Sequence, residues 1–165
     1  MAHRSAVVSR IPDDEVVDAV MAASRGLVAV AARSIAQVDE SLTLPQFRAL
    51  VVLDLHGPST VGALAAELGV HGSTVTRLCD RLVSRHLVGR ATSPENRREV
   101  VVDLLPAGRD VVRRVTRARR RAVGAIVGEV PAEHRRSMVA ALQAFADAAG
   151  HAPEPVWSAG WDLHG

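Results

Sequence analysis

Threonine, serine and arginine side chains gather on one side of a helix expected between residues 73 and 85. Arginine can donate two parallel hydrogen bonds to guanine or to a phosphate, and threonine can touch the methyl group of thymine. This polar side therefore suits the major groove of DNA. Its members are Thr74, Thr76, Arg77, Asp80, Arg81, Ser84 and Arg85.

The opposite side of the same helix is apolar, which predicts that it packs into a core. Ser73 is expected to cap the start of the helix, because a serine hydroxyl can accept a hydrogen bond from a backbone N–H of the first turn. Apolar residues recur at i, i+3, i+4, i+7 and i+8, the spacing of a buried stripe. They are Val75, Leu78, Cys79, Leu82 and Val83.

Two further arginines, Arg97 and Arg98, lie in a turn-rich segment at residues 93–98. The stretches on either side, 87–92 and 99–105, contain residues that favour strands, so the sequence predicts a β-hairpin with a basic tip. The minor groove of DNA has a negative potential that attracts arginine. We expect the tip to reach the minor groove next to the major groove that the helix occupies.

The arginines form two blocks, although the net charge of the 165-residue chain is only +2. Residues 70–98 hold six Arg against Asp80 and Glu95, and residues 106–136 hold nine Arg against three acidic residues. Such blocks favour a polyanionic partner. The chain has no Lys and no Tyr. A standard Walker A loop, Schiff-base chemistry on lysine and acid catalysis by tyrosine are therefore excluded.

Five other helices are expected from the spacing of apolar residues and from the placement of Gly and Pro. Ser59 or Thr60 can cap the third of these helices, and Gly69 can end it. The predicted fold is mainly α-helical with one small β-hairpin. The five helices span residues 12–40, 45–55, 61–68, 106–130 and 131–149, and a tail follows at 150–165.

The segment LTLPQFRALVVLDLHGPSTVGALAAELGVHGSTVTRLCDRLVSRHLVGRATSPENRREVVVDLLPAGRDVV resembles the MarR family of bacterial transcription regulators. The resemblance implies a winged helix-turn-helix DNA-binding lobe at 41–105, whose hairpin is the wing. It implies dimerisation through the helices at 1–40 and 106–149, with a tail at 150–165. It also implies a homodimer that binds a pseudo-palindromic operator in double-stranded DNA, usually as a repressor, and that a small aromatic or anionic ligand releases.

The resemblance also assigns roles to individual residues. Positions at the start of the recognition helix match the groove-facing residues of the family, and two later arginines lie nearer to phosphates. The tip of the wing carries the arginine that enters the minor groove, with a second arginine beside it. These residues are Ser73, Thr74, Thr76 and Arg77, then Arg81 and Arg85, and finally Arg98 and Arg97.

Four positions depart from the family pattern. Asn96 stands where the family usually has an Asp that braces the wing arginine, and Ser93 replaces another common Asp. His86 replaces a common Gly just past the recognition helix, where a left-handed conformation costs more for His. Leu105 replaces a frequent Thr that would cap the long helix.

The resemblance places a ligand pocket between the dimerisation region and the DNA-binding lobe. Its expected neighbours are Arg33, Phe47, Leu50 and Arg113. No cofactor is expected, and the seven His residues include no i, i+3 or i, i+4 pair that would indicate a helical zinc site.

Two alternative functions stay open at this point. The departures at Asn96 and His86 leave room for a protein-interaction module that keeps the fold without binding DNA. Cys79 could act as a thiol redox switch, although its place on the apolar stripe favours core packing. An enzyme is not expected, because the chain contains neither G-x-S-x-G nor G-x-G-x-x-G.

The expected location is the cytoplasm. Cys79 is the only cysteine, so no intrachain disulfide can form, and a reducing compartment is the default. The first residues carry no apolar leader, and the longest apolar stretch, near 16–30, is interrupted by Asp18 and Arg25. We therefore expect neither a signal peptide nor a membrane span.

Arg98→Ala should weaken binding to the operator, because the minor groove would lose its cationic contact. Binding should also fall steeply with salt, since several phosphate contacts release counterions. A gel-shift titration at low and moderate salt measures both effects. An unchanged affinity for Arg98→Ala would remove the wing from the mechanism.

Overall fold

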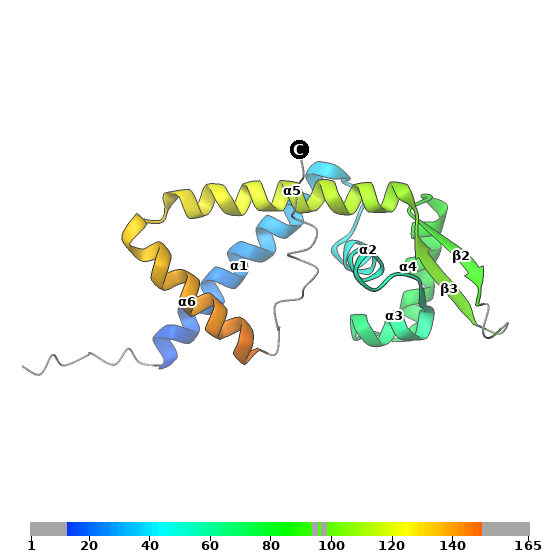
Figure 1. Cartoon of the computed structure of the whole chain (residues 1–165), viewed down its shortest axis with the longest axis horizontal. Helices are drawn as coiled ribbons and strands as arrows, with labels where there is room; N and C mark the ends of the chain where they lie inside the picture. The colour runs from blue at the N-terminus through cyan, green and yellow to red at the C-terminus, as the bar shows by residue number, and fades with distance from the viewer. Residues whose placement is uncertain (1–12, 94–95, 97–98, 150–165) are drawn as a thin grey trace, which may run out of the picture.

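The computed structural model describes residues 13–93, 96 and 99–149, and it consists of six helices and three short strands within those residues. Figure 1 shows a lobe that contains α2, α3, α4 and the strands at one end, with the start of α1 and α6 at the other. The long helix α5 joins the two ends. The elements are α1 (Asp13–Val38), α2 (Leu44–His56), β1 (Ser59–Thr60), α3 (Val61–Leu68), α4 (Gly72–Ser84), β2 (Val88–Thr92), β3 (Val100–Leu104), α5 (Pro106–Glu129) and α6 (Ala132–Ala148).

Side-chain caps and a left-handed glycine set the bounds of α2 and α3. A capping box starts α2: the hydroxyl of Thr43 accepts from the amide of Gln46 at 3.4 Å, and Gln46 Oε1 accepts from the amide of Thr43 at 2.9 Å. Thr60 caps α3 by accepting from the amide of Ala63 at 3.1 Å. Gly69, at φ +68°, ends α3, so the predicted cap and stop of this helix are confirmed.

Ser73 does not cap α4, and that prediction is wrong. The helix begins one residue earlier, at Gly72, with His71 in the cap position and no side chain accepting from the first turn. The carbonyl of His71 accepts from the amides of Thr74 and Val75, so Ser73 already lies inside the first turn. Its hydroxyl is thereby left on the exposed side of the helix.

The predicted hairpin forms, with one additional strand. β2 and β3 pair antiparallel, with Val88 opposite Leu104 and Thr92 opposite Val100. The sequence reasoning missed β1, a strand of two residues that pairs with β3 and gives the sheet order β1–β3–β2. The two residues of β1 include the cap of α3, so the sheet leads directly into the helix-turn-helix.

The core of the lobe forms around the apolar stripe of α4. Val75, Cys79 and Leu82 have no exposed surface. They belong to one cluster with buried side chains of the other elements, which are aliphatic except for Phe47. Burial of a side chain of this size contributes about 1.5–3 kcal/mol, so the stripe fixes which side of α4 faces outward. The other members include Ile35, Phe47, Leu50, Leu53, Leu64, Leu87, Val88, Val102, Leu104, Val111 and Val115.

The end of the molecule formed by α1 and α6 buries little. α1 buries only Val30, Ser34 and Ile35 near its C-terminal end, where it packs against α5, and α6 buries none of its residues. Large apolar side chains are therefore left exposed at this end: Val16, Val17, Met21, Leu27, Val28, Ile126, Val139, Leu142 and Phe145.

No helix in the described part of the chain is both long and apolar enough to cross a membrane.

Two of the family departures have visible structural effects. His86 has φ +56°, so the left-handed conformation that suits glycine is adopted here by a side chain that tolerates it less well. Leu105 occupies the cap position of α5 without a side-chain hydrogen bond, as expected, and Pro106 follows at the first helical position. The turn at His86 and the start of α5 meet, because the amide of Leu105 donates to the carbonyl of Leu87 at 3.0 Å.

Gly108 allows the first turn of α5 to press against the base of the wing. A Cβ atom at this position would lie 2.2 Å from the carbonyl oxygen of Leu87 and 2.6 Å from Cδ1 of Leu104. Backbone atoms cannot move aside as a flexible side chain can, so the close approach requires glycine.

Gly108→Ala should lower the free energy of unfolding by about 1–3 kcal/mol, because the added methyl overpacks the junction of α5 and the wing. Urea denaturation followed by circular dichroism measures the loss. Gly62→Ala is the matched control, since its Cβ would meet nothing closer than Thr60 Oγ1 at 3.9 Å. Equal stabilities of the two variants would contradict the packing argument.

Candidate nucleic-acid interface

The exposed side of α4 carries most of the residues predicted to face a DNA groove. Ser73, Thr74, Thr76, Arg77 and Arg81 are all exposed, on the side opposite the buried stripe. The hydroxyl of Thr76 donates to the carbonyl of Gly72 at 3.0 Å. Five of the six predicted recognition-helix residues therefore lie where a groove could reach them.

The sixth predicted residue, Arg85, has a different environment. It follows the last residue of α4, and its Nη2 atom donates to Oδ2 of Asp39, just after α1. Its side chain is 27% exposed and that of Asp39 is 20% exposed. Arg85 is thus brought to the end of α1 rather than to the open side of α4.

The carboxylate of Asp39 is held on both oxygens. Its Oδ1 accepts from the amide of Ser41 at 3.0 Å and from the Ser41 hydroxyl at 2.8 Å. Burial alone raises the pKa of Asp39, but the hydrogen bonds from Ser41 and Arg85 outweigh it and lower that pKa below its ordinary value. The group is therefore ionised at neutral pH. Its contribution to stability is lost only as the pH falls through the lowered pKa.

The predicted wing residues Arg97 and Arg98 lie outside the described residues. The neighbouring turn is described at Ser93, Asn96 and Glu99. The amide of Asn96 donates to the hydroxyl of Ser93 at 3.3 Å, and Asn96 Nδ2 donates to Glu99 Oε1 at 3.1 Å. The two residues that replace family carboxylates therefore still hydrogen-bond within the turn at the end of the hairpin.

Arg90 of β2 ties the wing to the recognition helix, a role that the sequence reasoning missed. Its Nη1 atom lies 2.6 Å from Oδ1 of Asp80, and its Nη2 atom donates to the carbonyl of Thr76 at 3.2 Å. The planar guanidinium can make both contacts at once, which a lysine ammonium cannot do with the same geometry. The only sequence signal was opposite charge on a helix and a following strand.

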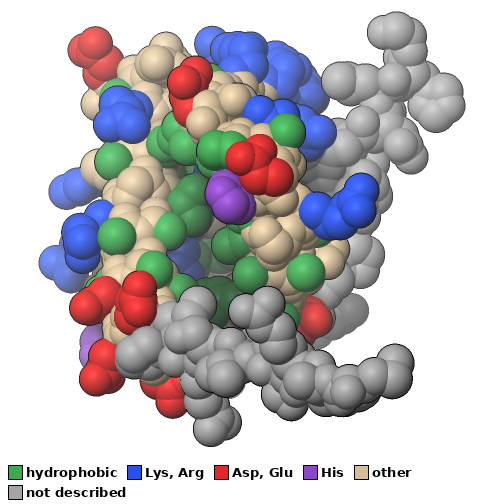
Figure 2. Space-filling view, turned by 90° about the vertical axis from the view of Figure 1, so that its left-hand side faces the viewer, with side chains coloured by type: hydrophobic (Ala, Val, Ile, Leu, Met, Phe, Trp, Pro, Cys, Tyr) green, Lys and Arg blue, Asp and Glu red, His purple; other side chains and the backbone are tan. Residues whose placement is uncertain are grey.

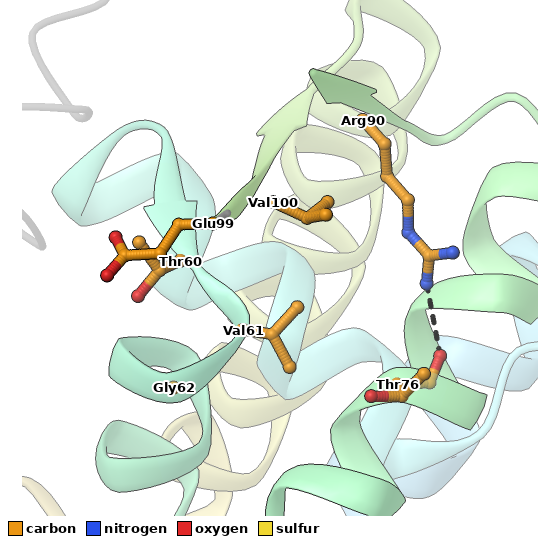
Figure 3. Close-up of a pocket in the computed structure, with 7 residues that line it drawn as sticks. All are labelled: Thr60, Val61, Gly62, Thr76, Arg90, Glu99 and Val100. Atoms are coloured by element: carbon orange, nitrogen blue, oxygen red, sulfur yellow. Dashed lines mark hydrogen bonds between the residues drawn. The ribbon is translucent and has the colours of Figure 1, made fainter. Parts of the chain in front are cut away.

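A cavity of about 460 Å³ opens between the wing, α4 and the start of α3. Figure 3 shows Arg90 reaching across it from the sheet toward Thr76 on α4. The wall combines hydroxyl, guanidinium and carboxylate groups with two valines, so it is polar on part of its surface. Its lining residues are Thr60, Val61, Gly62, Thr76, Arg90, Glu99 and Val100.

The residues predicted to surround a ligand do not line this cavity. Phe47 and Leu50 are buried in the core of the lobe, with 7% and 0% exposure. Arg33 is exposed on α1. Arg113 is exposed on α5, where its Nη2 atom lies 3.3 Å from Oδ1 of Asp110. Within this chain the four residues divide between core and surface, and their role in a ligand site stays a prediction.

Cys79 has the buried environment expected for a packing residue. It has no exposed surface, and burial raises the pKa of its thiol, an effect that the nearby charge of Arg90 only partly offsets. A buried thiol with a raised pKa is a poor nucleophile, which favours packing over a redox role. Within residues 13–93, 96 and 99–149, no three His, Cys, Asp or Glu side chains are grouped so that they could hold a metal ion.

Comparisons with known proteins agree with this architecture. A family model described as MarR family matches residues 42–100. The crystal structure of RV1404 from Mycobacterium tuberculosis is similar, with 46% sequence identity and a TM-score of 0.81. The similarity covers 88% of this chain and 99% of that one.

Two curated relatives match over shorter regions. The HTH-type transcriptional regulator YsmB of Bacillus subtilis (strain 168) is 37% identical over 75 residues, 46% of this chain and 51% of that protein. The HTH-type transcriptional repressor NicR of Pseudomonas putida (strain KT2440) is 37% identical over 70 residues, 42% of this chain and 44% of that protein. The chain thus matches about half the length of these relatives, which are transcription regulators and not enzymes.

Proposed function

The chain belongs to the MarR family, and on that premise we propose that it is a homodimeric regulator that binds a pseudo-palindromic operator in double-stranded DNA. The observation that carries the proposal is the two-sided character of α4. Val75, Cys79 and Leu82 are fully buried, while Ser73, Arg77 and other polar residues on the opposite side are exposed. This arrangement presents hydrogen-bonding groups to a groove on a helix whose rotation is fixed.

Arginine supplies every strongly basic contact that such a surface can make. Arg77 and Arg81 are exposed on α4, one turn apart. Guanidinium groups remain protonated at any accessible pH and bind guanine or phosphate with two hydrogen bonds. We assign Arg77 to the groove and Arg81 to the phosphate backbone, with Arg97 and Arg98 of the wing as the minor-groove contact.

A second copy of this chain is the proposed partner of α1 and α6. Figure 2 views this end of the molecule and shows hydrophobic side chains gathered around a hollow. Val139, Leu142 and Phe145 of α6 are each more than half exposed in the protomer, as are Val17 and Met21 of α1. Large apolar side chains exposed together at one end of a molecule are typical of an interface. A two-fold dimer would place the two copies of α4 about 34 Å apart, in successive major grooves.

We further propose that the regulator is a repressor, released by a small aromatic or anionic ligand, and that it acts in the cytoplasm. The relative NicR is named a repressor. Arg33 and Arg113 expose cationic groups between the lobe and the proposed dimer interface, where they could attract an anion. Phe47 and Leu50 lie in the adjacent core, so a ligand that reaches them must open part of the packing.

Arg77→Ala should weaken binding to DNA from the region upstream of the protein's own gene roughly tenfold, since one bidentate base contact is worth about 1–3 kcal/mol. Fluorescence anisotropy with labelled DNA at several salt concentrations measures affinity and salt dependence. Arg48→Ala is the matched control, because Arg48 is exposed on α2 and is not among the predicted contacts. If the wild-type chain binds none of this DNA at any salt concentration, the result would contradict the proposal and favour the alternative of a protein-interaction module.

Phe145→Glu should convert the dimer into a monomer and greatly weaken operator binding, because a charge would be buried in the proposed interface. Light scattering after size-exclusion chromatography should give twice the chain mass of 17.5 kDa for the wild type and that mass for the variant. Gln143→Glu adds the same charge at an exposed polar position of α6 and serves as the control. A dimeric Phe145→Glu variant would place the interface elsewhere.

A further inference from the structure

The ion pair between Arg85 and Asp39 joins two elements that are far apart in the sequence. Arg85 directly follows α4, and Asp39 directly follows α1. The pair is more enclosed than the other ion pairs between described residues, with side-chain exposures of 27% and 20%. Ser41 holds the second oxygen of Asp39 by two hydrogen bonds, so the carboxylate has a fixed direction.

We propose that Arg85 and Asp39 are positioning residues, which attach the C-terminal end of the recognition helix to the end of α1, and that Arg85 does not bind phosphate. The inference rests on the proposed function, because it concerns DNA binding by α4. It replaces the role in phosphate binding that the sequence suggests for Arg85.

The enclosure of the guanidinium supports a role inside the protein. Nη1 of Arg85 is shielded from solvent by the surrounding protein, and Nη2 donates to Asp39. Arg81 and Arg77, one and two turns earlier, are exposed. For Arg85 to reach a phosphate, it would have to leave Asp39 and uncover a partly buried carboxylate. Leaving one charge of such a pair without its partner is unfavourable.

Arg85 adds a directional contact at the end of α4, beside the apolar packing of Leu82. The buried stripe fixes the rotation of α4, but contacts between aliphatic side chains are not directional. Arg90 attaches the middle of the helix to β2 through Asp80 and the carbonyl of Thr76. Arg85 attaches its end to α1, whose other end lies in the proposed dimer interface. The pair therefore links the geometry of the dimer to the position of α4.

The two roles predict opposite effects of Asp39→Asn. If Arg85 binds phosphate, Asp39 competes for it, and removal of the carboxylate should tighten DNA binding and steepen its salt dependence. If the pair positions α4, removal of the carboxylate should release the helix end and weaken binding. The salt dependence should then stay unchanged, because no phosphate contact is lost.

The experiment measures operator affinity by fluorescence anisotropy from low to moderate salt for the full chain and for Asp39→Asn, Arg85→Gln and the double variant. We expect each single variant to weaken binding about three- to tenfold with an unchanged slope of log affinity against log salt. The double variant should be no weaker than either single variant, because both remove the same contact. Asp39→Glu keeps the charge and should restore part of the affinity.

Two controls separate positioning from general effects. Asp110→Asn removes an exposed carboxylate on α5, whose Oδ2 atom lies 2.8 Å from Nε of Arg114. This variant should not weaken DNA binding. Thermal unfolding of every variant shows whether any of them is partly unfolded at the assay temperature. If one is, the DNA affinities are measured again at a temperature below its unfolding transition.

Tighter binding by Asp39→Asn, or a slope that falls by about 1 in Arg85→Gln, would overturn the inference and assign Arg85 to a phosphate. Both of those results require that the wild-type chain binds DNA, so the proposed function would survive them. If the wild-type chain does not bind DNA, the proposed function and this inference fall together.

Discussion

Burial of the apolar stripe of α4 is the constraint on which the candidate interface depends. Val75, Cys79 and Leu82 are fully buried in a core cluster, and α4 packs against α2, α3 and β2. A rotation of α4 that exposed them would forfeit several kcal/mol, more than a hydrogen bond on the other side could return. Apolar residues that never meet a partner molecule therefore decide which polar residues, such as Arg77, can meet one.

Directional polar contacts add to the apolar packing that holds α4. Arg90 and Arg85 each use a guanidinium to connect α4 to another element, the wing in one case and α1 in the other. Gly108 sets the distance between α5 and the base of the wing, because no side chain fits there. The recognition helix is thus held by three kinds of contact: the buried apolar stripe, the guanidinium contacts of Arg85 and Arg90, and the close approach that Gly108 allows.

Much of the fold could be predicted from the sequence because its signals are periodic and local. The stripe from Val75 to Val83, the cap at Thr60 and the stop at Gly69 all act within one or two helical turns, and the structure confirms each of them. The predicted cap at Ser73 was wrong because the true cap position is two residues earlier, at His71, which supplies no side-chain signal. β1 was missed because two residues carry no detectable alternation.

The charged attachments could not be predicted in the same way. Asp39 and Arg85 are 46 residues apart, and Arg90 and Asp80 lie on different types of element. No periodic pattern joins such residues, since their contact exists only after the chain has folded. For the same reason Arg85 was predicted from its spacing to lie beside Arg81 on an open face. Its exposure is in fact decided by a partner at the end of another helix.

The close contact at Gly108 holds the first turn of α5 against the base of the wing, so the rest of the helix extends from the lobe as a long arm. At about 1.5 Å per residue, the 24 residues of α5 extend roughly 36 Å from the wing toward α6. A tilt of only about 5° at the far end of a rod of this length would carry the lobe roughly 3 Å, comparable to the length of a hydrogen bond. If two copies meet at the far end of α5, as proposed, the helix would act as a lever, and small adjustments there would become displacements large enough to make or break the proposed contacts with a DNA groove.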